Sequence, residues 1–322
     1  MPVMATIGWH ASHEQIPPSR LLADVRRAQE AGFALAMSSD HFEPWSERQG
    51  ESGFAWSWLG AALATTDLPF RVVTAPGQRY HPAILAQAMA TLAEMFPGRL
   101  SVCLGSGEAM NEHVTGGDWP PKPVRNARLG ECARVIRDLL AGEEVTHKGL
   151  VTVDRARLWT RPAAPPPLLG AAVSPETARW LGGWADGLAT VNQPRERLAQ
   201  VVDAFREGGG EGKPMLLQVH LSWAASEEEA LGIAHDQWRT NVFAPPLCWD
   251  LDTAGHFDQA ARHVRPEDVR DVVLVSADLA RHAEWIREAA ELGFEEIALH
   301  HVGKRQDAFI DAFGEHVLPA MA

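Results

Sequence analysis

Short apolar runs of strand length alternate with helical segments along this chain, and no other feature constrains its fold as strongly. Buried strands that are joined by helices form a parallel sheet with right-handed crossovers. An open doubly wound sheet and a closed barrel both fit this alternation, and the number of strands favours the barrel. We expect strands at residues 4–9, 32–37, 70–75, 99–104, 168–172, 187–191, 215–221 and 296–301.

Helical periodicity and stop signals fill the intervals between these strands. Pro17-Pro18-Ser19 predicts a helix start, and Gly32 predicts the end of that helix. The stretch 145–153 alternates instead like a hairpin, with its turn near Lys148-Gly149. We therefore predict an α/β fold, a (β/α)8 TIM barrel, with a β-hairpin insertion after the fourth helix that caps the barrel. Further helices are expected at residues 54–65, 83–96, 125–140, 284–292 and 308–321.

Length, charge and cysteine usage bound the class of protein. The 322 residues fit a single TIM-barrel domain that spans residues 1–322. The formal net charge of −13 argues against a nucleic-acid partner and against binding to an anionic membrane. The three cysteines include no C-x-x-C pair, which excludes a disulfide framework and a zinc ribbon. No signal peptide or membrane-length apolar run is visible, so we expect a cytoplasmic protein. The expected partner is a small-molecule substrate.

An acid, an imidazole and an indole follow the second predicted strand within six positions. They are Asp40, His41 and Trp45, in a segment that must turn at Pro44. Ionisable groups at the carboxyl ends of parallel strands are where α/β folds place catalysts and ligands. The alternative is an Asp that caps a turn beside an ordinary surface imidazole.

A glycine pair followed by an acid stands in the same position after the fourth predicted strand. Gly105-Ser106-Gly107-Glu108 resembles part of a dinucleotide fingerprint, but the third glycine is missing. Glycines at this place let the backbone approach a flat ligand closely, and Glu108 would lie at the barrel mouth. The alternative is a helix-initiating turn in which Glu108 interacts with the helix dipole.

Together the two stretches resemble the bacterial-luciferase-like flavin monooxygenase superfamily, and more closely its branch of deazaflavin-dependent glucose-6-phosphate dehydrogenases. The resemblance covers most of the chain and is densest in residues 1–140. The combination of S-D-H-F-x-P-W with G-x-G-E-A-x-N-E is specific, whereas either motif alone is not. The matching residues are Ser12 to Gln15, Ser39 to Phe42 with Pro44-Trp45, Arg79-Tyr80-x-Pro82, Gln87-Ala88, Gly105-x-Gly107-Glu108-Ala109-x-Asn111-Glu112, the hairpin and Gly170 to Ala172.

The resemblance implies an oxidoreductase or monooxygenase whose barrel mouth holds the ring of a flavin or deazaflavin. It implies that His41 handles the proton beside the hydride-accepting atom, that Trp45 walls the substrate, and that Glu108 manages protonation at the far ring edge. Imidazole chemistry agrees, because hydride can leave an alcohol only if a proton is removed as well. Asp40 and Glu14 are implied as pocket or supporting groups, and a homodimer through helices of the first half is expected. The further cofactor-binding residues are Thr74, Ala75, Gly105, Ser106, Gly107 and Asn111.

The chain departs from the sugar-phosphate enzymes of this branch after strands six to eight. The segments 190–193 and 270–273 place no cation equivalent to theirs, and a dianionic phosphate would bind poorly without one. Glucose 6-phosphate is therefore rejected as the substrate. The chain resembles a subgroup of this branch that is thought to have returned to an ordinary flavin, and this resemblance implies FMN as the cofactor, with coenzyme F420 as the alternative. Strand three is also shortened, so a cis Ala75–Pro76 bond can replace the non-prolyl cis bond that many members carry.

The loop Ala171-Ala172-Val173-Ser174 and the helix N-terminus after it form the natural site for the phosphate end of FMN. Ser174 and Thr177 can add hydroxyl donors there. A plain helix cap explains Ser174 equally well.

Two rival functions belong to other classes. His10, His41, His220 and His300 stand near predicted strand ends, and converging imidazoles can bind a divalent metal in a hydrolase. No H-x-H pair follows the first strand, which argues against that function. A barrel that binds a flavin without turnover is the second rival, and the presence of both His41 and Glu108 argues against it.

Overall fold

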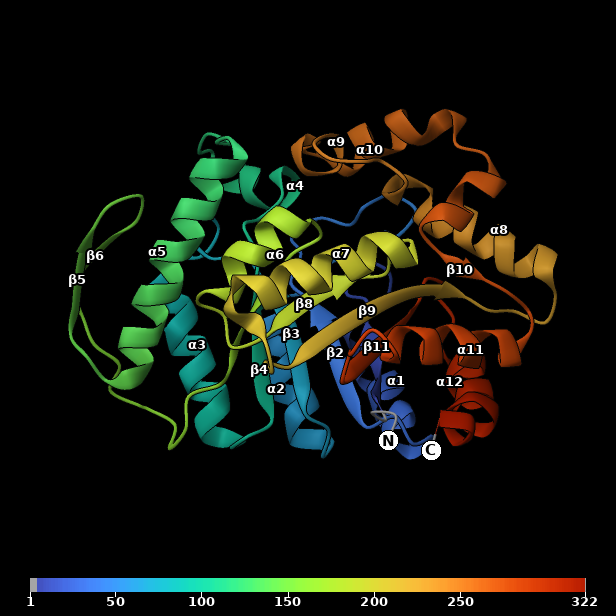
Figure 1. Ribbon diagram of the computed structural model, residues 1–322, viewed down its shortest axis with the longest axis horizontal. Helices are drawn as coiled ribbons and strands as arrows, with labels where there is room; N and C mark the ends of the chain where they lie inside the picture. Colours follow the sequence, from blue (N-terminus) through green and yellow to red (C-terminus); the bar gives the residue numbers. More distant parts are fainter. Residues whose placement is uncertain (1–4, 322) are drawn as a thin grey trace.

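Eight parallel strands close into a barrel in the computed structural model, which describes residues 5–321 (Figure 1). The order around the barrel is β1, β2, β3, β4, β7, β8, β9 and β11, and β11 pairs with β1 to complete it. The predicted TIM barrel is confirmed, and the open sheet is wrong. The strands are β1 (Thr6–Ala11), β2 (Leu35–Ser39), β3 (Phe70–Thr74), β4 (Leu100–Leu104), β7 (Leu168–Ala171), β8 (Leu188–Val191), β9 (Met215–Ser222) and β11 (Glu296–His301).

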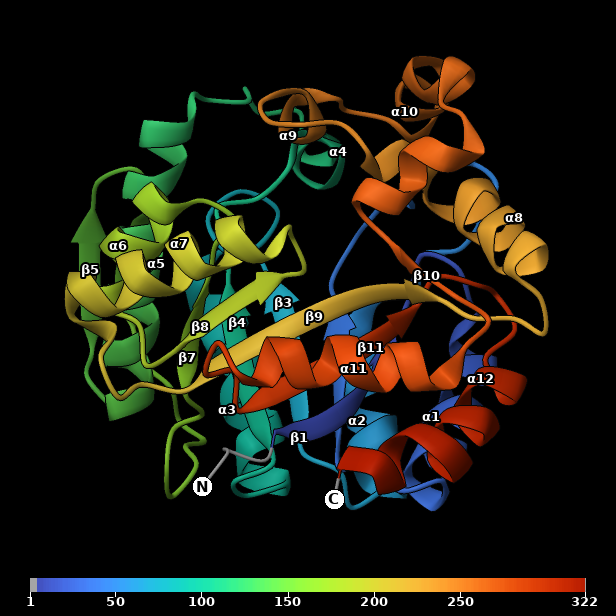
Figure 2. The ribbon, with the colours of Figure 1, turned by 45° about the vertical axis from the view of Figure 1, so that its right-hand side comes forward.

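Helices cover the outside of the barrel (Figures 1 and 2). α1 shows why they form, since it starts at a proline, buries Leu21, Val25 and Ala28 on one face, and is followed by Gly32 with φ of 99°. No helix within residues 5–321 has both the length and the apolar character needed to cross a membrane. The helices are α1 (Pro18–Glu30), α2 (Ala55–Thr65), α3 (Pro82–Met95), α4 (Ala109–Glu112), α5 (Lys122–Ala141), α6 (Pro175–Gly182), α7 (Arg195–Phe205), α8 (Glu227–Trp238), α9 (Leu247–Asp250), α10 (Ala254–Ala260), α11 (Leu279–Ala290) and α12 (Asp307–Ala312).

The second strand starts later than the sequence indicated and includes two serines assigned to the following loop. Ser38 and Ser39 belong to β2 because they stay in register with Val72 and Val73 of β3. Phe33 precedes the strand, where its backbone N–H bonds to the last turn of α1 and its ring is buried. The polar motif of the second strand therefore begins inside the barrel wall.

Two further expectations need correction at the backbone level. The first strand runs on to Ala11, and Met4, where we expected it to start, lies outside the described residues. The expected cis Ala75–Pro76 bond is wrong, because the only cis peptide bond within residues 5–321 joins Pro245 and Pro246.

The antiparallel strands β5 (Val145–Lys148) and β6 (Thr152–Ala156) form a separate two-stranded sheet. This sheet lies beside α5, at the left of Figure 1, where His147 Nε2 is 2.8 Å from Glu131 Oε2. None of its residues lines the cavity of the barrel, so the expectation that the hairpin caps the barrel is wrong.

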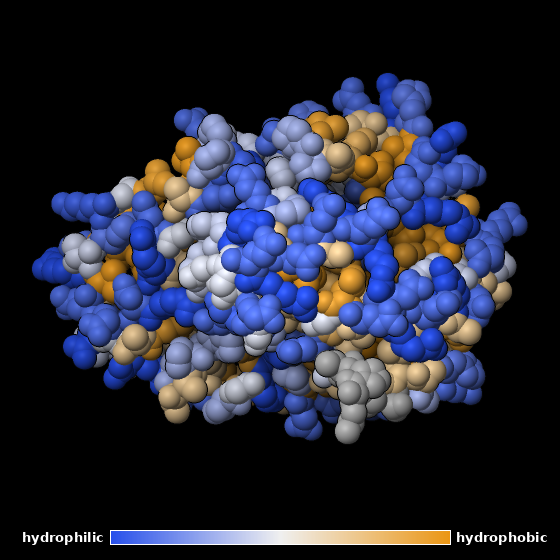
Figure 3. All heavy atoms as spheres, in the orientation of Figure 1, coloured by the Kyte–Doolittle hydropathy of each residue, from blue (hydrophilic) through white to orange (hydrophobic). Residues whose placement is uncertain are grey.

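A different segment, residues 239–264, extends over the mouth of the barrel. It carries α9 and α10, and α9 contacts α4, so that segments far apart in the sequence lie side by side at the top of Figure 2. Figure 3 shows hydrophobic residues gathered over this segment on a face that is otherwise mainly hydrophilic. The two-residue strand β10 (Leu274–Val275) follows the segment and pairs with the end of β9.

Candidate active site

A cavity of about 790 Å³ opens at the carboxyl ends of the barrel strands. Its size is within the range of sites that enclose organic ligands. Every residue that the sequence analysis assigned to the site lines this one cavity. They are Glu14, Asp40, His41, Trp45, Thr74, Ala75, Gly105, Ser106, Gly107, Glu108, Asn111, Ala171, Ala172, Ser174 and Thr177.

His41 lies between two carboxyl groups in this cavity. Its Nδ1 is 3.3 Å from Oε1 of Glu14, and its Nε2 is 3.9 Å from Oε2 of Glu108. Trp45 meets the imidazole edge-on, with 5.2 Å between ring centroids. The two motifs that stand far apart in the sequence therefore meet at one imidazole.

Burial favours the uncharged form of His41 and of its carboxyl neighbour. Burial, followed by the charges of Arg79 and His13, lowers the pKa of His41 to about 3. Burial raises the pKa of Glu14 to about 7, although Glu14 accepts a hydrogen bond from Ser12 Oγ at 2.9 Å that opposes the shift. At the pH near 3 where His41 titrates, Glu14 is protonated and uncharged. Glu14 can stabilise a positive charge on His41 only at a pH where the Glu14 carboxyl is ionised. Near neutral pH the imidazole is uncharged and can accept a proton.

Asn111 joins the loop that carries His41 to the acid at position 108. Its Oδ1 accepts the backbone N–H of Phe42 at 2.8 Å, and its Nδ2 donates to Oε2 of Glu108 at 3.3 Å. Burial, followed by the carboxyls of Glu14 and Glu112, raises the pKa of Glu108 to about 7. Glu108 therefore exists in both protonation states near neutral pH and can either give or take a proton.

Asp40 is held by partners from three other segments. Its Oδ2 accepts from Trp56 Nε1 at 3.1 Å and from Thr74 Oγ1 at 2.8 Å, and its Oδ1 accepts from the Tyr80 hydroxyl at 3.0 Å. The guanidinium of Arg79 donates to its backbone carbonyl and lies 3.5 Å from Oδ2. Because both carboxylate oxygens are occupied in this way, Asp40 anchors the end of β2 immediately before His41.

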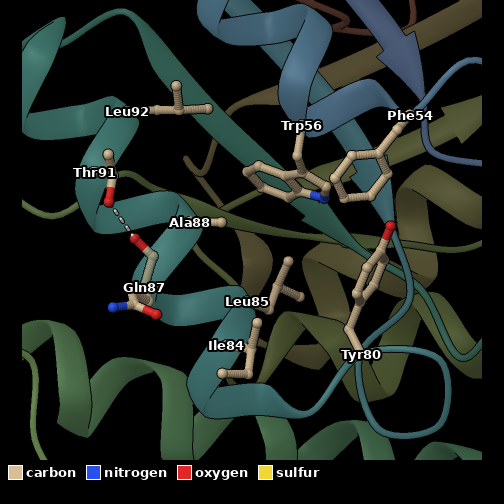
Figure 4. Close-up of a pocket in the computed structure, with 9 residues that line it drawn as sticks. All are labelled: Phe54, Trp56, Tyr80, Ile84, Leu85, Gln87, Ala88, Thr91 and Leu92. Atoms are coloured by element: carbon tan, nitrogen blue, oxygen red, sulfur yellow. Dashed lines mark hydrogen bonds between the residues drawn. The ribbon is translucent and has the colours of Figure 1, made fainter.

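A second hollow of about 370 Å³ lies on the outside of the barrel, between α2 and α3 (Figure 4). Trp56 and Tyr80 line this outer hollow and also donate to Asp40. Phe54 and Ile84 at its rim expose 53% and 61% of their surface. The outer hollow is lined by no carboxyl or imidazole, so it offers apolar area and not acid–base chemistry.

One end of the main cavity gathers hydroxyl groups and a cation. Lys122 Nζ donates to Ser106 Oγ at 3.0 Å and lies 4.4 Å from the centroid of the Trp249 ring. The carboxylates of Glu108 and, more weakly, of Glu176 in the first turn of α6 act to raise the pKa of this lysine. Burial, followed by the charge of Arg125, lowers that pKa. Ser174 caps α6 through the backbone N–H of residue 177, as the alternative interpretation had it. Lys122 was not predicted as a site residue, because it stands at the start of α5 and not directly after a strand.

On the opposite wall, His220 and His300 were foreseen only as possible metal ligands, and Gln218 and Trp238 were not foreseen. Gln218, His220 and His300 from β9 and β11 line it together with Trp238 of α8. The two β9 residues stand two positions apart, so they share a face of the strand, and that spacing was the signal available. The other unforeseen lining residues, several of them from the segment 239–264, are Thr190, Asn192, Gln193, Arg197, Val242, Phe243, Cys248 and Trp249.

The histidines that suggested a metal site do converge. The ring centroid of His300 is 4.3 Å from that of His10 and 5.4 Å from that of His220. Burial lowers the pKa of all three, to about 4 for His220. Within residues 5–321 there is no group of three or more His, Cys, Asp or Glu side chains arranged to hold a metal ion.

One family model and relatives of a single description match almost the whole of this chain. Residues 3–296 match the family described as luciferase-like monooxygenase. An F420-dependent glucose-6-phosphate dehydrogenase of Nakamurella multipartita is 33% identical, over 98% of this chain and 96% of that protein. The enzyme of the same description from Intrasporangium calvum is 34% identical, over 99% of both chains.

Solved structures agree with the fold. An F420-dependent secondary alcohol dehydrogenase, in complex with an F420–acetone adduct, matches with a TM-score of 0.92 and 31% identity over 99% of both chains. The coenzyme F420 dependent tetrahydromethanopterin reductase of Methanopyrus kandleri has a TM-score of 0.78 at 20% identity, which supports the barrel fold alone.

Proposed function

The chain belongs to the luciferase-like monooxygenase family, and on this premise we propose that it is a deazaflavin-dependent dehydrogenase of an uncharged alcohol. It is an oxidoreductase, as its relatives are. The observation that carries the proposal is the placement of His41 between Glu14 and Glu108 in the main cavity. This arrangement provides a neutral base and a nearby acid, which dehydrogenation of an alcohol requires.

Coenzyme F420 is the cofactor that the relatives favour. The two curated relatives and the alcohol dehydrogenase named above are all F420-dependent. The expectation of FMN rested on an assumed return of this subgroup to an ordinary flavin, and none of these relatives supports it. We therefore place FMN second.

The cavity carries groups suited to a planar ring with an anionic tail. A Cβ at Gly105 would make only ordinary contacts, 3.8 Å from both the Ala171 side chain and the Thr74 carbonyl. Because Gly105 lines the cavity without a side chain, a flat ring can approach its backbone closely. Ser106 and Lys122 at the α6 end suit a phosphate. When bound, F420 supplies a ring that accepts a hydride.

The residues around His41 manage the proton that an alcohol must lose. Nδ1 of His41 is fully buried, so Nε2 is the nitrogen that can take the hydroxyl proton in the cavity. Ionised Glu14, 3.3 Å from Nδ1, keeps the ring proton on Nδ1 and stabilises the imidazolium that results. Trp45 packs against the imidazole. Glu108, near Nε2 of His41, carries a proton at pH values below its pKa of about 7.

If Lys122 binds the phosphate of the cofactor, the part of the cavity left for the substrate has uncharged walls. Gln218, His220 and His300 line that part, and none of these three imidazole or amide groups carries charge near pH 7. A neutral alcohol fits this wall better than a sugar phosphate does. Glucose 6-phosphate is the second candidate because the curated relatives are named for it, and Arg197 at the cavity edge is a cation that the sequence analysis did not count.

A titration and an assay test the proposed function. Purified protein is titrated separately with F420 and FMN, and loss of the oxidised deazaflavin absorbance is followed with propan-2-ol or glucose 6-phosphate. We expect F420 to bind more tightly than FMN and propan-2-ol to reduce it. Reduction by glucose 6-phosphate alone would replace the alcohol with the sugar phosphate. Turnover that requires FMN and oxygen would instead make the protein a monooxygenase.

The homodimer also stays a proposal, and the outer hollow of Figure 4 suggests where it forms. Phe54 and Ile84 expose apolar area there, on the first half of the chain. Light scattering should give twice the mass of the chain for the natural protein and a lower mass for Ile84→Glu. The matched change Trp159→Glu, at a residue that is 88% exposed, should leave the mass unchanged.

A further inference from the structure

A chain of hydrogen bonds fixes the protons on the uncharged wall of the cavity. It begins at the backbone carbonyl of Val302, which can only accept. Gln15 Nε2 lies 2.5 Å from that oxygen and 3.0 Å from Oε1 of Gln237, so this end of the Gln15 amide is its NH2 group. The Oε1 of Gln15 consequently faces His300 Nε2 at 3.1 Å, and His300 must donate its Nε2 proton to it.

The tautomer of His300 determines the next two bonds. A neutral imidazole with its proton on Nε2 accepts at Nδ1, and Gln218 Nε2 donates to that nitrogen at 3.2 Å. The same NH2 group lies 3.2 Å from Nε2 of His220. His220 therefore accepts at Nε2 and carries its proton on Nδ1. The proton positions on His300 and His220 therefore follow from the Val302 carbonyl, because at each step only one amide orientation or imidazole tautomer satisfies the hydrogen bonds.

Two positions of this network have no partner among residues 5–321. They are the acceptor Oε1 of Gln218 and the donor Nδ1–H of His220, and both residues line the cavity. Trp238 packs against the network, with its ring centroid 4.9 Å from that of His220. The two residues stand two positions apart on one face of β9, and both line the cavity. An acceptor and a donor of fixed identity on one strand face, next to the Trp238 ring, match a hydroxyl group, which both donates and accepts.

We infer that Gln218 and His220 bind a second hydroxyl group of the substrate, distinct from the hydroxyl that is oxidised. The substrate class is then an uncharged diol or polyol, and this inference rests on the proposed function. An anionic group is disfavoured at this position because it would face the Gln218 amide oxygen. Recognition by a buried pair discriminates strongly, since a substrate without the hydroxyl leaves both groups unpaired.

The experiment compares alcohols that differ only in the second hydroxyl. With F420 as cofactor, kcat/KM is measured for butan-2-ol against butane-2,3-diol and for pentan-2-ol against pentane-2,4-diol. We expect at least one diol to exceed its mono-alcohol about tenfold or more, which corresponds to about 1.4 kcal/mol. The ratio should fall toward one in Gln218→Leu and in His220→Phe. Gln259→Leu, which replaces an exposed neutral amide of α10 outside the cavity lining, should keep the natural ratio.

The outcomes separate this inference from the proposed function. If F420 fails to bind or no alcohol reduces it, the proposed function is wrong. If mono-alcohols are oxidised and neither diol is preferred, or if the preference survives both substitutions, only the second-hydroxyl site is wrong. Nitrogen-15 NMR of the natural protein tests the network without turnover or variants that might misfold, because it distinguishes protonated from bare ring nitrogens. A proton on Nε2 of His220 would overturn the inference.

Discussion

Nδ1 of His41 lies 3.3 Å from Oε1 of Glu14, and burial holds both groups toward their uncharged forms. A neutral His41 can therefore lie beside either a protonated or an ionised Glu14. Only the ionised Glu14 carboxylate favours transfer of a proton to the imidazole. The titration of Glu14, with a pKa of about 7, thus controls the strength of His41 as a base.

Removal of the imidazole should stop turnover and spare cofactor binding. We expect His41→Gln to lower kcat by roughly 10²–10⁴-fold, the usual contribution of a general base. The dissociation constant for F420, measured by quenching of its fluorescence, should change by less than about twofold. His256→Gln, a change at an exposed histidine of α10, serves as the control. Full activity of the His41 variant would show that this imidazole takes no part.

Activity should depend on pH through Glu14. Its pKa is raised to about 7, so the carboxylate that supports His41 is lost as the pH falls through about 7. We predict that kcat/KM with propan-2-ol falls on the acid side of this value. Glu14→Gln should lower kcat/KM and remove that limb of the profile, whereas Glu47→Gln, at an exposed residue, should leave the profile unchanged. A natural protein with a flat profile between pH 5 and 8 would contradict the assignment.

Glu108 should destabilise the cofactor-free protein in alkaline solution. A carboxyl whose pKa rises on folding contributes stability that is present below its unfolded pKa and is lost as the pH rises through about 7. Its side chain is 28% exposed, so we expect Glu108→Gln to gain only about 1–2 kcal/mol at pH 8. This corresponds to about 2–3 °C in the thermal midpoint. The gain should nearly vanish at pH 4, below the unfolded pKa, and an equal gain at both pH values would point to packing instead of charge.

Lys122 should contribute to cofactor affinity through charge. Its contact with Ser106 Oγ and its place near α6 suit the phosphate end of F420. We expect Lys122→Met to raise the dissociation constant about tenfold at low salt, and the difference should shrink as salt is added. Lys148→Met, at an exposed residue of β5, is the matched control. An unchanged constant for Lys122→Met would place the phosphate elsewhere.

Local pattern was sufficient for the barrel. Apolar runs such as 215–221 and stop signals such as Gly32 located strands and helices to within a few residues, because buried strands and helix ends depend on nearby sequence. The start of β2 was misplaced because Phe33 is apolar yet packs as a loop residue, bonded to the end of α1. Long-range register with β3 decides where that strand begins, and a single sequence does not reveal register.

The candidate site divides in the same way. His41 and Glu108 stand directly after strands, so topology alone brings them to one cavity. Lys122 and Trp238 reach the cavity from helices, and their distance from any strand end concealed them. The cover over the mouth was assigned to the hairpin because its alternation was conspicuous. The irregular segment 239–264, which provides the cover, has no periodicity by which to recognise it.

The amide of Asn111 holds Phe42 N–H with one atom and the Glu108 carboxylate with the other. The loop that carries His41 and the Glu108 side chain consequently share one support, so in the proposed function the base and the acid depend on the same amide. A substitution at Asn111 would disturb the loop that carries His41 and the Glu108 carboxyl together, and a compensating change at only one of the two would not restore both. Any redesign of this barrel for a different oxidation should therefore keep that amide and vary the wall formed by β9 and α8.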